Sequence, residues 1–299
     1  MSDIPREDRS WGSDRKANLL FELIGDLKSE YKFERSVKIQ QKKLLGNRFM
    51  LGLYKSKIGE TPHEKLVDIC RRMDMPENLF EAFSENLSDA EGVGFGFEET
   101  ERTRVYKVYL DFMDKWKKEN RCGPDQRDPL LVILGFKWDI QDKKKGGLAK
   151  YVWHPNLPID EIQKRISDVF GKDGHGKPSE IATRLLDIVS RRISSHSILY
   201  LDVADDKGRR RSFDMNLYGA NLQLKEIYPL LQEALQHYSI PTRKFHPLYN
   251  SLRSLRFGHL SGGIGSGGAD FLTIYFGIES VHKAPTAVDP EQPARLKAG

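Results

Sequence analysis

The stretch over residues 33–54, FERSVKIQQKKLLGNRFMLGLY, alternates side chains of two kinds along two runs. Because successive side chains of a strand point to opposite faces, this alternation predicts two antiparallel strands, whose turn we place around Gly46 and Asn47. One face is apolar. The other face is polar and carries Glu34, Lys38, Arg48 and Tyr54. A helix over about 61–72 follows, with Thr61 as its expected N-cap.

This unit of a hairpin followed by a helix recurs along the chain and determines the fold class. Strand pairs separated by turn residues predict five hairpins, which span residues 33–54, 93–112, 130–155, 197–219 and 254–280. Helical spacing of apolar residues predicts helices over residues 17–32, 61–72, 74–87, 111–120, 158–170, 179–193 and 222–238. Ser179 is the expected cap of its helix. The hairpins exclude a parallel strand–helix barrel.

About ten antiparallel strands favour a closed barrel, because an open sheet of that size curls and leaves exposed edges. The return strands carry apolar residues at one parity, which helices must cover: Val108, Leu110, Phe213, Met215, Leu217, Leu272, Ile274 and Phe276. A ring of ten strands is wider than the eight-stranded ring that side chains just fill. We therefore expect an α+β fold, a ten-stranded antiparallel β-barrel with a solvent-filled, polar-lined lumen ringed by α-helices.

Composition adds limits on the class of protein. The net charge of +5 is small, with 48 basic against 43 acidic residues, and the basic runs 143–145 and 209–211 lie at predicted turns, so charge does not indicate nucleic-acid binding. No apolar run approaches the ~20 residues of a membrane helix. The N-terminus lacks an apolar signal core, so we expect a cytoplasmic protein in which Cys70 and Cys122 are free thiols. The expected organisation is a flexible leader (1–15), a single barrel domain (16–281) and a disordered tail (282–299).

The polar parity of the strands indicates a lumen that binds an anion. Its cations are Lys38, Arg48, Lys107 and Lys137, and its tyrosines are Tyr54, Tyr109, Tyr151, Tyr218 and Tyr275. Cations on separate strands suit a di- or tri-anionic ligand, and aromatic rings stabilise a cation in a dry site. Such a lumen can hold a pyrophosphate while its rings shield an allylic carbocation. Glu34 would then orient, or take a proton from, the attacking nucleophile.

The same residues also have structural interpretations. Lys107 and Lys137 fit solvated outward charges, and the tyrosines fit ordinary core aromatics. Arg48 fits an ion pair with Glu34 across the first hairpin.

Two other kinds of site are not supported by the sequence. His154 and His259 lack metal-ligand spacing, and there is no DDxxD pattern, so we expect no metal ligands on the protein. The glycine-rich residues 258–270 lie within a hairpin rather than between a strand and a helix, which does not fit a phosphate-binding loop. A flexible turn at the barrel rim fits them better.

Short motifs carry a resemblance to a known family. The first hairpin contains Glu34, Lys38-Ile39 and Arg48-Phe49 in order, with Leu44-Leu45 between. Further matches are the strand pair 94–110 with Lys107, and Leu134-Gly135-Phe136 followed by Tyr151. On these motifs the chain resembles the cyanobactin-type peptide prenyltransferases, members of the ABBA or PT-barrel family, over roughly residues 20–280.

The resemblance implies five ββα repeats and the transfer of a dimethylallyl or geranyl group from its pyrophosphate to a side chain or terminus of a ribosomal peptide natural product. By resemblance Glu34 is the catalytic base. The residues implied at the pyrophosphate are Arg48, Lys107, Lys137, Tyr151 and Tyr275. The residues implied around the carbocation and the substrate are Tyr109, Tyr218 and Asp214, with Tyr151 and Tyr275 contributing to the same cage. The return strand of the fourth hairpin, FDMNLYG, has fewer aromatic residues than the family pattern leads us to expect, and its Asp214 is a candidate to face the lumen and bind a basic acceptor.

The resemblance also implies Mg²⁺ bound through the pyrophosphate, a monomer, and no nucleic-acid or membrane partner. Two alternatives stay open: a prenyltransferase of the same fold that acts on a small aromatic molecule, and a non-enzymatic barrel that binds an anionic or amphipathic ligand. Glu34 discriminates an enzyme from a carrier, because a carrier has no use for a carboxylate beside a pyrophosphate, whereas an electrophilic substitution does.

Overall fold

The computed structural model describes residues 15–100, 102–171 and 176–281. Residues 1–14 of the expected leader, and the whole expected tail over 282–299, lie outside these described residues.

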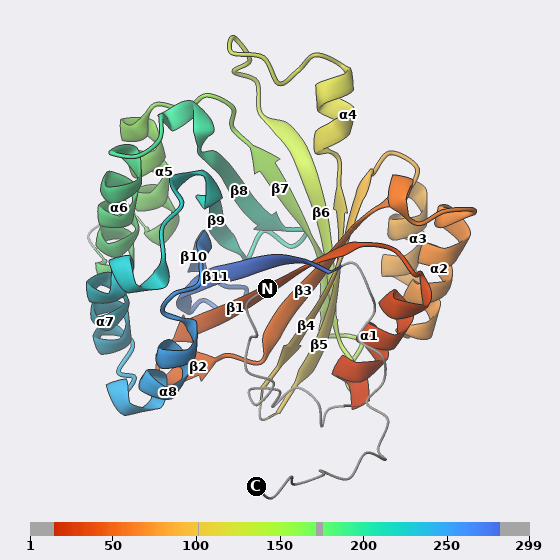
Figure 1. The fold of residues 1–299 in the computed structure, drawn as a ribbon, viewed down its shortest axis with the longest axis horizontal. Coiled ribbons are helices and arrows are strands. Elements are labelled where there is room, and N and C mark those ends of the chain that lie inside the picture. Colours follow the sequence, from red (N-terminus) through yellow and green to blue (C-terminus); the bar gives the residue numbers. More distant parts are fainter. Residues whose placement is uncertain (1–14, 101, 172–175, 282–299) are drawn as a thin grey trace, which may run out of the picture.

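The strands form one antiparallel sheet that closes on itself (Figure 1). They are β1 (Tyr31–Gln40), β2 (Lys43–Leu45), β3 (Arg48–Tyr54), β4 (Gly92–Glu99), β5 (Arg104–Asp111), β6 (Leu130–Asp139), β7 (Gly146–Trp153), β8 (Leu199–Asp205), β9 (Arg211–Asn216), β10 (Phe257–Ile264) and β11 (Asp270–Val281). The order is β11-β10-β9-β8-β7-β6-β5-β4-β3-β1-β2, and a further β11–β1 pairing closes the ring. The first and last strands pair from Tyr31↔Val281 to Ile39↔Leu272. Because β2 and β3 pair with the same edge of β1, the ring has ten strand positions, which confirms the predicted barrel.

The first hairpin differs from the prediction in the position of its turn. The chain reverses at Gln41 and Lys42, where Lys42 has a φ of 59°, and β2 starts at once. The partners of Lys38 and Arg35 are Leu45 and Phe49, so the return strand contains one extra residue between these pairs. A bulge of one residue exchanges the two faces of a strand. The bulge around residues 46–47 therefore turns Arg48 into the barrel, whereas an uninterrupted register would place it outside.

The helices pack outside the barrel. They are α1 (Arg15–Asp26), α2 (Pro62–Arg72), α3 (Glu77–Asn86), α4 (Met113–Lys118), α5 (Ile159–Phe170), α6 (Lys177–Ser190), α7 (Tyr228–His237) and α8 (Thr242–Leu252). Short 3₁₀ turns are η3 (Lys55–Lys57), η4 (Ser195–Ser197), η5 (Tyr218–Ala220) and η6 (Leu224–Ile227). Helices α5 to α8 cover one side and α1 to α3 the opposite side, with α4 near one end (Figure 1).

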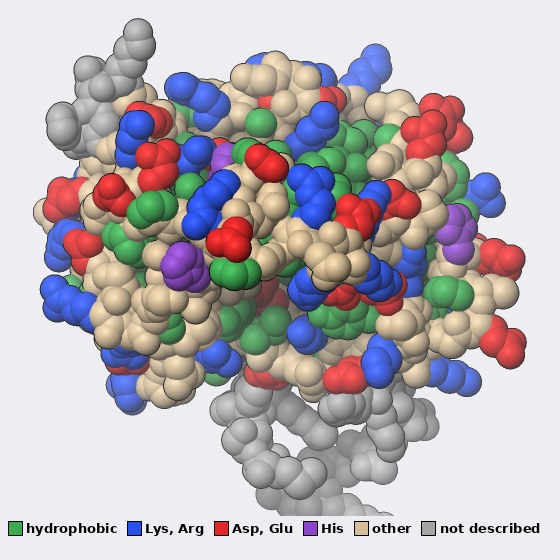
Figure 2. Space-filling view, turned by 90° about the horizontal axis from the view of Figure 1, so that it is seen from above, with side chains coloured by type: hydrophobic (Ala, Val, Ile, Leu, Met, Phe, Trp, Pro, Cys, Tyr) green, Lys and Arg blue, Asp and Glu red, His purple; other side chains and the backbone are tan. Residues whose placement is uncertain are grey.

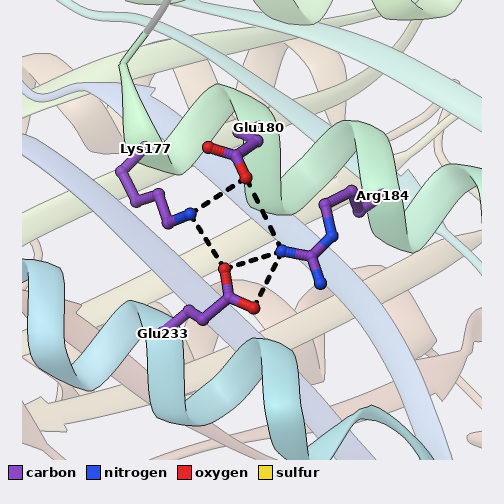
Figure 3. A network of polar contacts seen from close by, with 4 residues as sticks. All are labelled: Lys177, Glu180, Arg184 and Glu233. Carbon is purple, nitrogen blue, oxygen red and sulfur yellow. Dashed lines mark hydrogen bonds and ion pairs between the residues drawn. The ribbon is translucent and has the colours of Figure 1, made fainter.

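The hydrophobic core lies between the barrel wall and these helices. The outward residues of the return strands, such as Val108, Phe213 and Ile274, are buried there as predicted. One large apolar cluster joins α5 to α8 to β8–β11, and a second joins α1 to α3 to β3–β6. An ion network adds to the α6–α7 contact (Figure 3). In this network Glu233 Oε2 forms ion pairs with Lys177 Nζ at 2.9 Å and with Arg184 Nη1 at 2.7 Å. These side chains are partly exposed, so packing of the apolar residues beneath them contributes most of the stability.

Several predicted helix ends are wrong. The first helix ends at Asp26 rather than near residue 32, because β1 already begins at Tyr31. Thr61 precedes α2 but has a left-handed φ of 51°, and its hydroxyl makes no capping bond. Ser179 lies inside α6 and is buried, since this helix starts at Lys177.

Helix α8 was not predicted. Pro247 lies within it, and a proline in a helical pattern normally indicates a helix end because it lacks an N–H donor.

The two ends of the barrel differ. Because each hairpin turns back directly, all five hairpin turns lie at one end, which we call the turn end, and the helical connections start from the other, the connection end. Helix α4 lies over the connection end (Figure 1). Cationic, acidic and hydrophobic side chains are interspersed on this face (Figure 2). Among the described residues, no helix is long and apolar enough to cross a membrane.

Candidate functional site

The inward parity of the strands lines the lumen with polar residues, as predicted. Glu34 and Lys38 of β1 lie on the face opposite to the outward Val37 and Ile39. Cross-strand pairs carry this face around the ring: Arg48↔Glu98, Lys107↔Lys137, Ser261↔Asp214, His259↔Tyr275 and Lys38↔Thr273. Water reaches the interior, because several inward side chains are partly exposed, among them Lys38, Tyr109, Tyr151 and Tyr275.

A cluster of cations lies toward the turn end, and we call it the cation cluster: Lys38, Arg48, Lys107, Lys137 and Arg210. Glu98 lies within it. Lys107 Nζ donates to Glu98 Oε2 at 2.6 Å, and Arg48 Nη1 is 3.5 Å from the same oxygen. The Lys107 and Glu98 side chains are only 15% and 16% exposed. These pairs leave positive charge in excess, because the cations outnumber this carboxylate.

Burial, together with the excess positive charge, shifts the pKa values of the residues in the cluster. Burial lowers the pKa of Lys38 to about 7; Glu98 opposes this effect, while Arg48, Lys107 and Arg210 add to it. Burial likewise lowers the pKa of Lys107 to about 8, against the attraction of Glu98. The surrounding cations hold the pKa of Glu98 well below its usual range despite its burial. An anion that enters the cluster would restore the ordinary charge of both lysines.

Two members of the cluster come from the rim of the turn end. Arg210 precedes β9, and its Nε donates to Ser212 Oγ of the lumen wall at 2.7 Å. Phe271 of β11 lies beneath the cations, with Lys38 Nζ 4.3 Å and the guanidinium of Arg210 5.8 Å from its ring centroid. Lys137 lies at the rim with much of its side chain open to solvent, yet the surrounding barrel wall still removes enough water to lower its pKa, and Arg210 lowers it further. The predicted role of Lys137 thus falls on a peripheral residue.

Tyrosines occupy the middle of the lumen. The rings of Tyr109 and Tyr151 meet edge to face with centroids 6.1 Å apart. Gly135 allows this contact, because a Cβ there would lie 3.0 Å from Tyr151 and 3.1 Å from Tyr109. Burial raises the pKa of Tyr275, and its charged neighbours are Arg48, which lowers that pKa, and Asp214 and Glu34, which raise it. Tyr275 therefore lies between the cation cluster and the carboxylates described next.

Two carboxylates, a histidine and a tyrosine meet toward the connection end; we call them the carboxylate group: Glu34, Asp214, Tyr218 and His259. The Tyr218 hydroxyl donates to Glu34 Oε1 at 2.6 Å. His259 Nδ1 is 2.9 Å from Asp214 Oδ1, and its Nε2 is 4.0 Å from Glu34 Oε1. Burial raises the pKa of Glu34 above its usual value; His259 and the Tyr218 hydrogen bond counteract this rise in part, and Asp214 adds to it.

The position of Tyr218 depends on its neighbours. It lies in η5, one residue beyond Leu217 and outside the strand that was expected to carry it. Its ring rests on the backbone of Gly258, where any Cβ would overlap the ring, and Arg256 lies 5.3 Å from the ring centroid on another side. This packing aims the hydroxyl at Glu34.

The cation cluster and the carboxylate group are separated along the barrel. Lys38 and Glu34 are four residues apart on β1, which corresponds to ~13 Å of strand. Tyr109, Tyr151 and Tyr275 lie in the interval. The lumen therefore offers a cationic level, an aromatic level and an acidic level in sequence.

Most predicted site residues come together in this lumen, and the structure corrects some of their partners. The alternative pairing of Arg48 with Glu34 is wrong, because Arg48 is paired with Glu98. The alternative that Lys107 is a solvated outward charge is also wrong. Three contributors were missed. Glu98 has the inward parity of its strand, so the alternation of β4 could have identified it as a lumen residue. Arg210 looked like a solvated turn residue, and His259 was considered only as a metal ligand.

Comparisons with known proteins support the fold. No family model matches the chain, and no curated protein matches it in sequence. Solved structures do match. A 5-dimethylallyl tryptophan synthase from Streptomyces coelicolor, solved with DMASPP and Trp, superposes with a TM-score of 0.56 at 11% identity, covering 95% of this chain and 94% of that one.

Two further structures agree. The prenyltransferase PriB, solved with L-tryptophan and dimethylallyl thiolodiphosphate, has a TM-score of 0.56 at 12% identity over 82% of this chain and 79% of its own. AnaPT from Neosartorya fischeri has a TM-score of 0.51 at 14% identity over 82% and 77%. The chain has the ABBA prenyltransferase fold. These neighbours do not include a cyanobactin-type enzyme, so that subtype stays a prediction.

Proposed function

We propose that the protein transfers a prenyl group, dimethylallyl or geranyl, from its diphosphate to an acceptor held in the barrel lumen. The observation that carries this proposal is the order of the three levels: a cation cluster and the buried carboxylate of Glu34 lie ~13 Å apart along β1, with tyrosine rings between them. That order matches a donor with an anionic head and an apolar tail that meets a nucleophile at its far side.

The cation cluster is proposed to hold the diphosphate. Arg48 supports this assignment, because its Nε and Nη1 are buried and have no hydrogen-bond partner among the described residues. Buried donors without partners cost free energy, which a bound anion would recover. Lys38, Lys107 and Arg210 surround the same volume. The sequence predicted that Arg48, Lys107, Lys137, Tyr151 and Tyr275 bind the diphosphate. We add Lys38 and Arg210 to this set.

The proposed reaction is an electrophilic substitution. The bond between the allylic carbon and the diphosphate oxygen breaks, and its electron pair leaves with the diphosphate, where the cations stabilise the new charge. The rings of Tyr109, Tyr151 and Tyr275 shield the allylic cation. A nucleophilic atom of the acceptor bonds to that carbon, and the proton that it loses passes to Glu34.

For the acceptor we propose a peptide side chain or terminus, on the motifs of the first hairpin. An aromatic small molecule is the second candidate, favoured by the tryptophan bound in the structural neighbours. Asp214 and Glu34 together make the acceptor level acidic, which suits an acceptor that carries a basic group or an N–H donor. A non-enzymatic carrier would gain nothing from a buried carboxylate at that level.

Magnesium enters this proposal only as an ion carried by the diphosphate itself. In the described part of the chain no three His, Cys, Asp or Glu side chains converge as a metal site. Glu98, the carboxylate within the cation cluster, is already engaged by Lys107 at 2.6 Å. The protein residues therefore do not fit a resident metal, and no step above depends on one.

Mass spectrometry tests the function. The protein is incubated with dimethylallyl or geranyl diphosphate and a panel that contains free tryptophan, tyrosine and peptides with each nucleophilic side chain. We expect a gain of one isoprenoid unit on one acceptor class, which fixes the donor length, and fragmentation locates the modified atom. Absence of any adduct while the donor still binds would contradict an enzymatic role and favour a carrier.

Glu34→Gln tests the base in the same assay. It removes the charge and keeps the shape, so we expect turnover to fall ~10²–10⁴-fold with donor affinity nearly unchanged. The matched control is Glu85→Gln on the exposed surface of α3, for which we expect full turnover. Equal turnover in Glu34→Gln and wild type would remove Glu34 from the mechanism.

A further inference from the structure

His259 is the member of the carboxylate group for which the reaction above has no use. It extends from β10 into the lumen, between Asp214 of β9 on one side and Glu34 of β1 on the other. The side chains of Glu34, Asp214 and His259 are 4%, 11% and 22% exposed. The site is therefore shielded from bulk water, where charges interact strongly.

The geometry fixes the direction of the imidazole ring. Its Nδ1 lies 2.9 Å from Asp214 Oδ1, and its Nε2 faces Glu34 Oε1 at 4.0 Å. The ring packs edge to face against Tyr218 at 5.5 Å and in a tilted contact against Tyr275 at 5.6 Å. Two aromatic rings contact the imidazole, and a carboxylate contacts its Nδ1. These contacts leave the ring one orientation, in which Nε2 points toward Glu34.

We propose that His259, oriented by Asp214, is a positioning residue that favours the ionised form of the Glu34 carboxylate, which is the form able to accept the acceptor's proton. This inference rests on the proposed role of Glu34. Burial alone favours the neutral form of Glu34 and reduces the fraction that can act as a base. A positive charge 4.0 Å from Oε1 opposes that effect.

The electrostatics of the group support a charged imidazole. Burial lowers the pKa of His259, but Asp214 and Glu34 outweigh it and raise the pKa to about 9. At neutral pH the ring is then an imidazolium, so it has no free nitrogen to take a proton. His259 acts through its charge and is not itself the base.

The other groups around Glu34 do not replace this charge. Tyr218 from η5 donates a neutral hydrogen bond, and Tyr275 from β11 is neutral because burial raises its pKa. Asp214 adds a negative charge that raises the pKa of Glu34. From β3 the residue paired with Glu34 is Met50, which does not ionise. His259 is thus the cation that faces Glu34 among the described residues.

The test compares His259→Gln with His259→Lys, which keeps a positive charge. In His259→Gln we expect the acid limb of the rate–pH profile to move up by ~1–3 pH units, and in His259→Lys to stay near its wild-type position. His246→Gln, on α8 outside the barrel, is the matched control and should change nothing.

A second readout does not need activity. Carbon-13 NMR of labelled glutamate carboxyls follows Glu34 directly, with Glu34→Gln assigning its signal. The Glu34 titration should move upward in His259→Gln by the same amount as the kinetic limb. An unmoved titration in a folded His259→Gln protein would overturn the inference. If the wild type transferred no prenyl group, the proposed function would fail while the NMR result would still decide the role of His259.

Discussion

The lowered pKa values of Lys38 and Lys107 make donor binding depend on pH in a specific direction. Both lysines are partly neutral near pH 8 in the free protein, because their pKa values are about 7 and about 8. A bound diphosphate favours their charged forms and returns the pKa values toward the ordinary ~10.4. Binding then takes up protons, and donor affinity must fall as pH rises.

The size of this effect follows from the two pKa values. Between pH 7 and pH 9 the charged fraction of Lys38 falls ~50-fold and that of Lys107 ~10-fold. Together they predict a ~500-fold weaker affinity at pH 9, or ~3–4 kcal/mol. The donor does not contribute to this change, because a phosphate whose last pKa is ~6 keeps its charge above pH 7.

Calorimetry with dimethylallyl thiolodiphosphate measures both parts of the prediction. Titrations at pH 7, 8 and 9 give the affinity, and buffers of different ionisation enthalpy give the proton uptake, expected to be ~1.4 protons at pH 8. Lys38→Met should reduce the pH dependence to the ~10-fold part due to Lys107.

Unfolding cannot imitate this result. Above pH 7 the unfolded chain binds more protons at these lysines than the folded one, so their contribution to folded-state stability increases with pH. Affinity that stays constant within twofold from pH 7 to 9, with no proton uptake, would refute the reasoning.

Two substitutions test the remaining contacts. Arg48→Ala removes buried N–H groups that have no hydrogen-bond partner among the described residues, so we expect donor affinity to fall by about 1.5–3 kcal/mol by calorimetry. Arg191→Ala, at the exposed residue that follows α6, should leave the affinity unchanged, and equal affinities in both variants would make Arg48 structural. Gly258→Ala places a Cβ inside the ring of Tyr218, so we expect a loss of about 1–3 kcal/mol in the free energy of unfolding and reduced turnover, measured by chemical denaturation and mass spectrometry. Gly123→Ala, where a Cβ meets no atom within 4 Å, is the control, and a Gly258→Ala protein as stable as this control would show that the ring can move freely.

The barrel itself was predictable because period-two alternation is a local signal. Each hairpin shows it independently, and the inward positions of Glu34, Lys107 and Asp214 follow from the parity of their own strands. Closure followed from strand number alone. The pairing of β1 with β11 then brought residues from the two ends of the chain into one lumen.

Other features depend on contacts that no short window contains. The bulge at residues 46–47 follows from the pairing of β2 with β1, in which Leu44 packs against the core cluster. In the sequence Arg210 is one of three arginines in a turn, and its contacts with Ser212 and Phe271 from other parts of the barrel hold it in the lumen. Likewise, His259 acquires a role only when Asp214 and Glu34 face it from different strands.

The predictions of helix ends were wrong because they also rested on local signals alone. Thr61 and Ser179 are good capping residues, but Thr61 adopts a left-handed φ of 51° and Ser179 is buried inside α6, so neither hydroxyl caps its helix. Helix α8 persists despite Pro247 because Phe245 and Leu252 are buried against the core. In α8, packing therefore outweighed the local preference against a helix.

The central claim is that the diphosphate binds at the turn end of the lumen and that the prenyl group points toward Glu34. A crystal structure of the protein with dimethylallyl thiolodiphosphate tests it most directly. The account predicts diphosphate oxygens within hydrogen-bond distance of Arg48 and Lys107, with the dimethylallyl group among Tyr109, Tyr151 and Tyr275. A diphosphate bound beside Glu34 and Asp214, or outside the barrel, would contradict it.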